Sequence, residues 1–155
     1  GRDFSVLYGQ AERFGVQEIL EDAGYLSRKE SIALQAHSDI ILVSTWNTEN
    51  ELGIIPGKLY ECFLLKKPII AIVNGTKPNS ELKEMVNASR LGIAVETMLN
   101  NQEELLKDFL VNQYNRAIKG VKHTTNINEK YLKSFSYKSI AEELDVIMKE
   151  LLEKN

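Results

Sequence analysis

The stretch DIILVSTWNTENELGIIPGKLYECFLLKKPIIAIV, residues 39–73, determines the fold that this sequence predicts. It begins and ends with apolar runs rich in β-branched residues, at 39–44 and 68–73, which are typical of strands covered on both faces. Between them lie a polar loop and a helix expected from about Pro56 to Lys66. A strand, a helix and a second strand in this order favour two parallel strands joined by a helical crossover.

The same alternation continues toward the C-terminus. Residues 80–90 are predicted to form a helix with Asn79 as its N-cap. Residues 92–96 are predicted to form a strand, and 101–120 a long amphipathic helix. The apolar stripe expected on that long helix consists of Leu106, Phe109, Leu110 and Ala117.

Toward the N-terminus the pattern is shorter. Residues 4–9 are predicted as a strand, 11–24 as a helix that Gly24 closes, and 24–26 as a short strand. Ser27 and Glu30 have the spacing of a capping box, which predicts the start of the next helix. Together these elements indicate a Rossmann-like α/β domain, a parallel sheet with helices on both faces, over residues 1–120.

The last part of the chain differs in character. Residues 121–130 form a polar connector, and 137–153 are predicted to form an amphipathic helix. Its apolar residues recur at steps of three and four, which produces a continuous seam. This C-terminal part, residues 121–155, is expected to pack either on its own domain or against a second domain or chain. The seam residues are Ile140, Leu144, Ile147 and Leu151.

Composition narrows the functional classes. The chain has 155 residues, a net charge of −3 and one cysteine, Cys62. The absence of a basic cluster argues against a nucleic-acid partner, and a single cysteine excludes an internal disulfide framework. Since a single cysteine fits a reducing compartment, we expect a cytoplasmic protein, with attachment to a membrane surface as an alternative for the full-length protein. No apolar run is long enough for a membrane span. Because Gly1 is not an initiator methionine, we also expect a processed chain, a cloning remnant or a fragment of a longer protein.

The helix that begins near Pro56 follows a strand of the predicted sheet, at the edge where such sheets bind ligands. Pro56 suits the first helical position, and the N–H groups of Gly57, Lys58 and Leu59 are expected to be available to an anion. Lys58 opposes the helix dipole unless an anion compensates it. Glu61 lies one turn further on and can accept hydrogen bonds from hydroxyl groups of a sugar.

These features also have a plain structural interpretation. Lys58 and Glu61 could form a surface ion pair at i,i+3 spacing, with Pro56 and Gly57 as ordinary residues of a helix start. Cys62 is expected to be a small core residue. Trp46 could line the site or fill the loop.

The whole stretch nevertheless resembles a known family. The run from HSDIILVSTW through GIIPGKLYECFLLKKPIIAIV to ELKEMVNASRLGIAVE is similar to the nucleotide-sugar-binding C-terminal domain of retaining GT-B glycosyltransferases, the glycosyltransferase family 4-like group. The similarity covers roughly residues 24–96, and FSYKSIAEEL resembles the usual end of that domain.

The resemblance implies roles for individual residues. Glu61 would bind the ribose hydroxyls of the donor and Lys58 would lie against its diphosphate. Backbone groups from Gly53 to Gly57 would surround the donor, and Tyr25 and Leu26 would lie near the base. The other residues of the implied donor site are Ile54 and Ile55.

The resemblance further implies a sugar transferase that uses a nucleotide-diphosphate sugar, needs no metal or cofactor, and retains the anomeric configuration. Acceptor-binding and catalytic groups would come from a missing N-terminal domain, so these residues alone should bind a donor without transferring it. Many relatives have an acidic residue eight positions before the ribose glutamate, where this chain has Gly53, so the donor sugar, the base and the acceptor stay open. The alternatives are a non-catalytic interaction module that dimerises through its last helix, and another sugar-nucleotide enzyme such as an epimerase.

Overall fold

A three-stranded parallel sheet forms the centre of the larger of two compact units in this protein. The computed structural model describes residues 4–121 and 126–153. The chain divides into residues 1–31 and residues 32–155, and each unit is described by itself.

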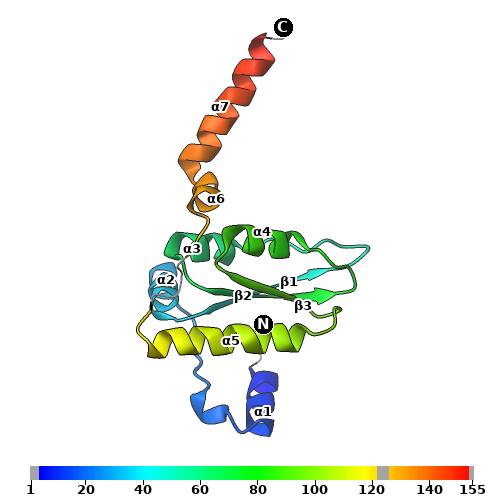
Figure 1. Cartoon of the computed structure of the whole chain (residues 1–155), viewed down its shortest axis with the longest axis vertical. Helices are drawn as coiled ribbons and strands as arrows, with labels where there is room; N and C mark the ends of the chain where they lie inside the picture. The colour runs from blue at the N-terminus through cyan, green and yellow to red at the C-terminus, as the bar shows by residue number, and fades with distance from the viewer. Residues whose placement is uncertain (1–3, 122–125, 154–155) are drawn as a thin grey trace. The chain divides into compact units, whose positions relative to one another are not determined.

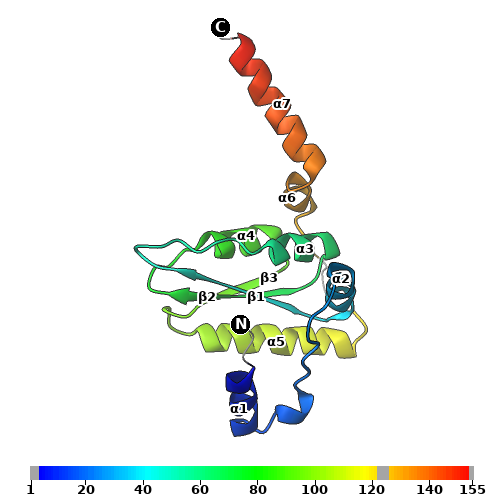
Figure 2. The ribbon, with the colours of Figure 1, turned by 180° about the vertical axis from the view of Figure 1, so that it is seen from behind.

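The sheet has the order β1-β2-β3, with β1 at Ile41–Asn47, β2 at Ile69–Gly75 and β3 at Gly92–Glu96. Both pairs of strands are parallel. Helices α3 (Gly57–Leu65) and α4 (Glu81–Ser89) cover one face, and α5 (Gln102–Ile118) lies on the other (Figure 1). Figure 2 gives the same layers from behind. The predicted α/β class, with a parallel sheet and helices on both faces, is therefore confirmed.

The core lies between the sheet and the layer of α3 and α4. Leu59 and Cys62 of α3 and Ile69, Val73 and Val86 are completely buried there. The apolar sides of these helices fix α3 against β1 and α4 against β2 and β3. The beginning of α3 therefore lies at the carboxyl edge of the sheet.

Burial of the strands differs from the prediction in one respect. In β2 the first three residues, Ile69 to Ala71, are all buried, as expected for a strand covered on both faces. In β1 burial alternates, and Leu42, Ser44 and Trp46 are exposed. The prediction is wrong for β1 because α5, the helix on that face of the sheet, packs against β3 and leaves this face of β1 uncovered.

The predictions for the first 26 residues are wrong. Residues 4–9 do not form a strand, since α1 occupies Ser5–Arg13, and 11–24 form no continuous helix. Gly15 has a positive φ of 66° and separates α1 from the short 3-10 helix η1 at Gln17–Ile19. The expected strand at 24–26 is not formed either. A strand needs a partner for its N–H and C=O groups, whereas a helix satisfies most of its own.

Several predicted helices are confirmed with small changes at their ends. Helix α2 is Arg28–His37, and its capping box is formed: Ser27 N–H donates to Glu30 and Glu30 N–H donates to Ser27 Oγ. The N-cap of α4 is Ser80 and not Asn79, because Ser80 Oγ accepts the N–H of Lys83. Asn79 instead has a positive φ of 61°.

The long helix α5 is also confirmed, but its apolar stripe is only partly correct. Leu106 and Phe109 are half-buried, whereas Leu110 and Ala117 are exposed. The inward side of α5 continues through Gln113 and Arg116, which are half-buried. Polar residues at these positions hid the true inward face from a search for apolar periodicity.

The C-terminal part contains a helix that was not predicted. Helix α6, Glu129–Ser134, begins at Asn128, whose side chain accepts the N–H of Tyr131 and donates to the carbonyl of Ala88. It packs against α4, and Leu132 belongs to the core. Of the polar connector expected at 121–130, residues 122–125 lie outside the described residues.

The amphipathic helix predicted at 137–153 is confirmed as α7, Tyr137–Glu153. Its seam residues are about half exposed, with exposed fractions between 48% and 59%. They are Ile140, Leu144, Ile147 and Leu151.

Candidate functional site

The carboxyl ends of the three strands lie at one edge of the sheet, because all strands are parallel. β1 ends at Asn47, β2 at Gly75 and β3 at Glu96. From these ends the chain continues into the N-termini of α3, α4 and α5, respectively. Open α/β sheets bind ligands at this edge.

The loop between β1 and α3 is folded back onto the end of β1. Leu52 forms a bridge with Asn47, and the Thr45 hydroxyl donates to the carbonyl of Ile54 over 2.8 Å. A Cβ atom on Gly53 would lie 1.8 Å from the carbonyl oxygen of Trp46. A glycine is therefore required at position 53 by contact with the protein's own backbone. The place of its backbone beside a donor, which the resemblance implies, stays a prediction.

The start of α3 differs in two details from the prediction. Pro56 is the N-cap, with an extended ψ of 135°, so that Gly57 and not Pro56 is the first helical residue. The N–H of Leu59 donates to the carbonyl of Pro56 over 2.9 Å and is therefore already used. Nothing lies within 4 Å of the position that a Cβ atom on Gly57 would take. The helix start is thus open to a ligand at Gly57.

The three helix N-termini at this edge differ in charge. Helix α4 has Glu81 and Glu84 in its first turn, and α5 has Glu103 and Glu104. The first turn of α3 has no acidic residue and receives no side-chain cap, and it contains Lys58. Because acidic side chains compensate the positive end of the helix dipole, α3 offers the most favourable of these positions to an anion.

Glu61, in the second turn of α3, contacts a neighbouring helix. Its Oε2 accepts a hydrogen bond of 2.8 Å from Nε2 of Gln35 on α2. Glu61 is half-buried, whereas Lys58 is exposed. Sequence reasoning missed Gln35, since no local spacing relates it to a residue 26 positions away.

The other predicted donor-site residues have different environments. Ile54 is exposed, and Ile55 is half-buried against the core. Tyr25 and Leu26 belong to residues 1–31, which form the other unit, so their role near a base stays a prediction.

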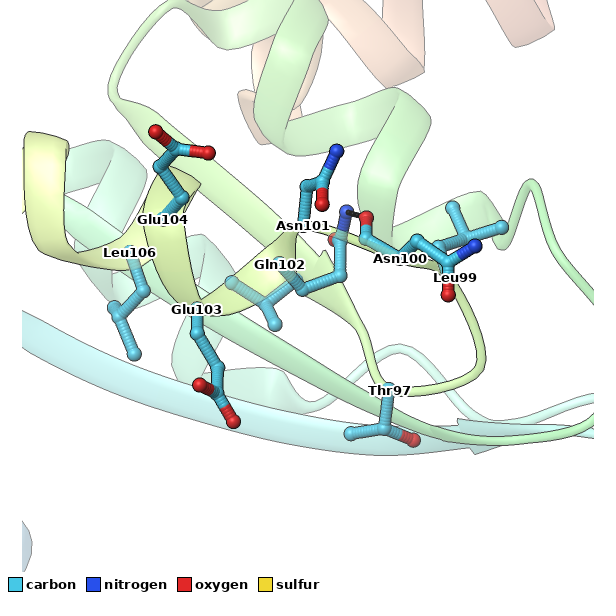
Figure 3. A pocket seen from close by; sticks show the side chains of 9 residues that line it. Thr97, Leu99, Asn100, Asn101, Gln102, Glu103, Glu104 and Leu106 are labelled. Carbon is cyan, nitrogen blue, oxygen red and sulfur yellow. Dashed lines mark hydrogen bonds between the residues drawn. The ribbon is translucent and has the colours of Figure 1, made fainter.

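Two hollows open at the carboxyl edge. A cavity of about 250 Å³ lies beside the loop that contains Gly53, and its lining includes Trp46, Asn47, Lys77 and Glu81. A larger hollow of about 600 Å³ is open between the end of β3 and the start of α5 (Figure 3).

Figure 3 shows that the side chains of Glu103 and Glu104 point to different sides of the start of α5. In the same hollow the Gln102 amide donates to the carbonyl of Asn100. The other end of that amide accepts the N–H of Glu96. Gln102 therefore serves the protein's own backbone, and the larger hollow shows no convergent set of ligand-binding groups.

A buried carboxylate at the end of β3 was not recognised in the sequence. Glu96 is completely buried and accepts hydrogen bonds from the N–H groups of Asn79 and Ser80 and from Nζ of Lys83, at 2.8 to 3.1 Å. These donors belong to the start of α4, so Glu96 occupies the place where an anion would otherwise bind. Its role is to hold α4 on the sheet.

Cys62 is a core residue, as the sequence predicted. It is completely buried, and burial raises the pKa of its thiol to about 11, against a smaller lowering by Lys58. Since the thiolate is the reactive form, we expect no alkylation by iodoacetamide at pH 8 in the native protein. Mass spectrometry should show complete alkylation once urea unfolds the chain, and rapid labelling of the native chain would contradict this assignment.

Across residues 4–121 and 126–153, no three His, Cys, Asp or Glu side chains are grouped as metal ligands would be. Within the same residues, no helix combines the length and apolar character needed to cross a membrane.

Comparisons with known proteins leave the site to be judged from its own geometry. No family model, no curated protein and no solved structure matches this chain.

Proposed function

We propose that this chain binds a nucleotide-diphosphate sugar at the start of α3 and is the donor-binding half of a retaining GT-B glycosyltransferase. The observation that supports this most strongly is the contrast among the helix starts at the carboxyl edge. Helices α4 and α5 begin with acidic residues, whereas α3 begins with Gly57 and Lys58 and has Glu61 one turn later. Helix α3 thus carries both a cation suited to a diphosphate, Lys58, and a carboxylate suited to a ribose, Glu61.

In this proposal each group has one task. The diphosphate lies against the N–H groups of Gly57 and Lys58 and against the Lys58 ammonium group. Glu61 accepts hydrogen bonds from the ribose hydroxyls. We assign the sugar to the cavity beside Gly53, because Asn47 and Glu81 in its lining offer polar groups that a glycine at position 53 does not.

The proposed reaction breaks the bond between the anomeric carbon of the sugar and the diphosphate oxygen, and forms a bond from that carbon to an acceptor hydroxyl oxygen. The acceptor hydroxyl releases its proton to solvent, and the electron pair of the broken bond stays on the diphosphate oxygen, which gains one negative charge. Lys58 and the start of α3 stabilise that charge as it develops. The acceptor and the remaining catalytic groups are assigned to a second domain, so this chain alone binds the donor without transferring the sugar.

Calorimetric titration of the chain with UDP, GDP and ADP tests the donor site. We expect saturable binding of at least one of them, and we expect Lys58→Ala to weaken it about tenfold, the effect of losing one charged hydrogen bond. Glu61→Gln should weaken nucleotide binding but leave inorganic pyrophosphate unaffected, since pyrophosphate has no ribose.

Lys107→Ala is the matched control, because Lys107 is an exposed lysine of α5 on the opposite face of the sheet. It removes the same charge from the chain and should leave binding unchanged. Absence of saturable binding, or equal effects of Lys58→Ala and Lys107→Ala, would contradict the donor site.

One observation favours a second candidate function, a non-catalytic interaction module. The seam of α7 is about half exposed over four apolar residues. Dimerisation that Leu144→Glu abolishes, in a protein that binds no nucleotide, would favour this module over the transferase.

A further inference from the structure

A buried amide supports the carboxylate that we assign to the ribose. Gln35 is only 7% exposed and is the one buried residue of α2. Its Nε2 lies 2.8 Å from Oε2 of Glu61, on a different helix. Helices usually bury apolar side chains against their neighbours, and a buried amide is unfavourable unless it is hydrogen-bonded. The bond to Glu61 thus compensates the burial of the Nε2 group of Gln35.

The hydrogen bond restricts the side chain of Glu61. A glutamate on a helix surface rotates about three bonds, and this freedom is lost when it must meet a ligand. Gln35 removes part of that freedom before a ligand arrives, which lowers the cost of binding. The Gln35 amide is also neutral, so it orients the Glu61 carboxylate without adding a positive charge beside it.

A carboxylate offers two oxygens with about four acceptor positions, so that a hydrogen bond from Gln35 and bonds from ligand hydroxyls can coexist on Glu61. A lysine at position 35 would form an ion pair with the same group and compete with hydroxyl donors. The neutral amide is thus suited to a carboxylate that receives hydroxyl groups.

We infer that Gln35 is a positioning residue that orients Glu61 and makes the site select ribonucleotides over 2′-deoxyribonucleotides. The inference depends on the proposed donor site, and it adds a residue and a specificity to it. A site built to bond a hydroxyl rejects the analogue that lacks it, because its own polar group is then left without that partner. The preference for ribonucleotides should consequently depend on how firmly the hydrogen bond from Gln35 orients the Glu61 carboxylate.

The test measures the affinities of the chain for UDP, GDP and ADP, for their 2′-deoxy counterparts and for inorganic pyrophosphate. The wild-type chain should prefer the ribonucleotide by about tenfold or more, the effect of one hydrogen bond to a charged group. Gln35→Met keeps the size of the side chain and removes the donor. It should reduce the preference to about threefold or less and leave the affinity for pyrophosphate unchanged.

A double-mutant cycle separates positioning from a general loss of structure. In the Glu61→Gln background, Gln35→Met should not change the preference further, because the carboxylate that it positions is gone. Ser38→Ala, directly after the end of α2, is the control: it removes the bond from the Ser38 hydroxyl to the carbonyl of Leu34 without touching Glu61. It should leave the preference intact, whatever its effect on stability.

The outcomes distinguish the two proposals. If the wild type prefers ribonucleotides and Glu61→Gln abolishes the preference while Gln35→Met does not, the donor site stands and the role of Gln35 is refuted. A change of the preference by Ser38→Ala as large as that by Gln35→Met would refute it as well. If the wild type binds no nucleotide, both proposals fail together.

Discussion

Gly53→Ala is expected to lower the free energy of unfolding by about 3 kcal/mol, a typical cost of forcing an extra carbon into a packed site. The added Cβ atom would meet the carbonyl oxygen of Trp46 at 1.8 Å and the hydroxyl oxygen of Thr45 at 2.4 Å. The nearest atom belongs to the backbone of β1 and cannot move aside. If the loop moves instead, it loses the bond between Thr45 and Ile54 and the bridge at Leu52.

Urea unfolding of Gly53→Ala and Gly57→Ala measures this effect with a matched control. Both substitutions add the same single carbon to the loop and helix start, but no atom lies within 4 Å of the added carbon at Gly57. Alanine at Gly57 should therefore be neutral or should stabilise the protein by up to about 1 kcal/mol, since it is a better helix former. Equal losses at both positions would contradict a specific contact at Gly53.

Glu96→Gln should have an effect of similar size, also about 3 kcal/mol at neutral pH, as expected when one partner of a buried ion pair is removed. The substitution keeps the shape of the side chain, but it leaves Lys83 without its partner at 2.8 Å. It also turns an amide toward two N–H groups that need acceptors. The start of α4 would lose its connection to β3.

The effect should depend on pH with a definite sign. Burial alone would raise the pKa of Glu96, but the hydrogen bonds from Lys83 and from two backbone N–H groups outweigh it and lower the pKa. A carboxyl group with a lowered pKa contributes stability that is fully present above its unfolded value, about 4.3. That contribution is lost as the pH falls through the folded value.

Unfolding free energies measured from pH 7 down to pH 2.5 check this prediction. The difference between the wild type and Glu96→Gln should be constant above about pH 5 and should narrow in more acidic solution. Glu81→Gln is the control, since Glu81 is an exposed glutamate in the first turn of α4, beside the N–H groups that Glu96 contacts. Its effect should stay below about 1 kcal/mol at every pH. A difference for Glu96 that persists unchanged at pH 2.5 would refute the assigned ionic role.

The segment from β1 through α3 to β2 could be predicted because several local signals agree there. Apolar runs identify the strands, a polar loop separates them from the helix, and Pro56 and Gly57 lie at the helix start. The capping box of Ser27 and Glu30 was equally readable, since both halves of the motif lie within one turn.

The errors come from signals that depend on distant partners. The apolar run at residues 4–9 resembles a strand, but a strand forms only where another strand can pair with it. The exposed face of β1 follows from the position of α5 over β3, which a short apolar run does not reveal. Local periodicity also missed α6, whose start depends on contacts between Asn128 and the end of α4.

The candidate site divides in the same way. Gly57, Lys58 and Glu61 could be found because their spacing within one helix start has chemical meaning. Gln35 and Glu96 could not, because each gains its role from a partner on another element. A glutamate at the end of an apolar strand and a glutamine in a polar helix look ordinary in a sequence.

The unequal helix starts also determine how an anion can orient itself along this edge. A negatively charged group that approaches α4 or α5 meets the carboxylates of their first turns, and at α4 the donors are already occupied by Glu96. Repulsion at the starts of α4 and α5 and attraction at the start of α3 therefore fix the orientation of an elongated, doubly charged molecule. Its charged group is drawn to Gly57, and only neutral parts of the molecule can extend toward the starts of α4 and α5.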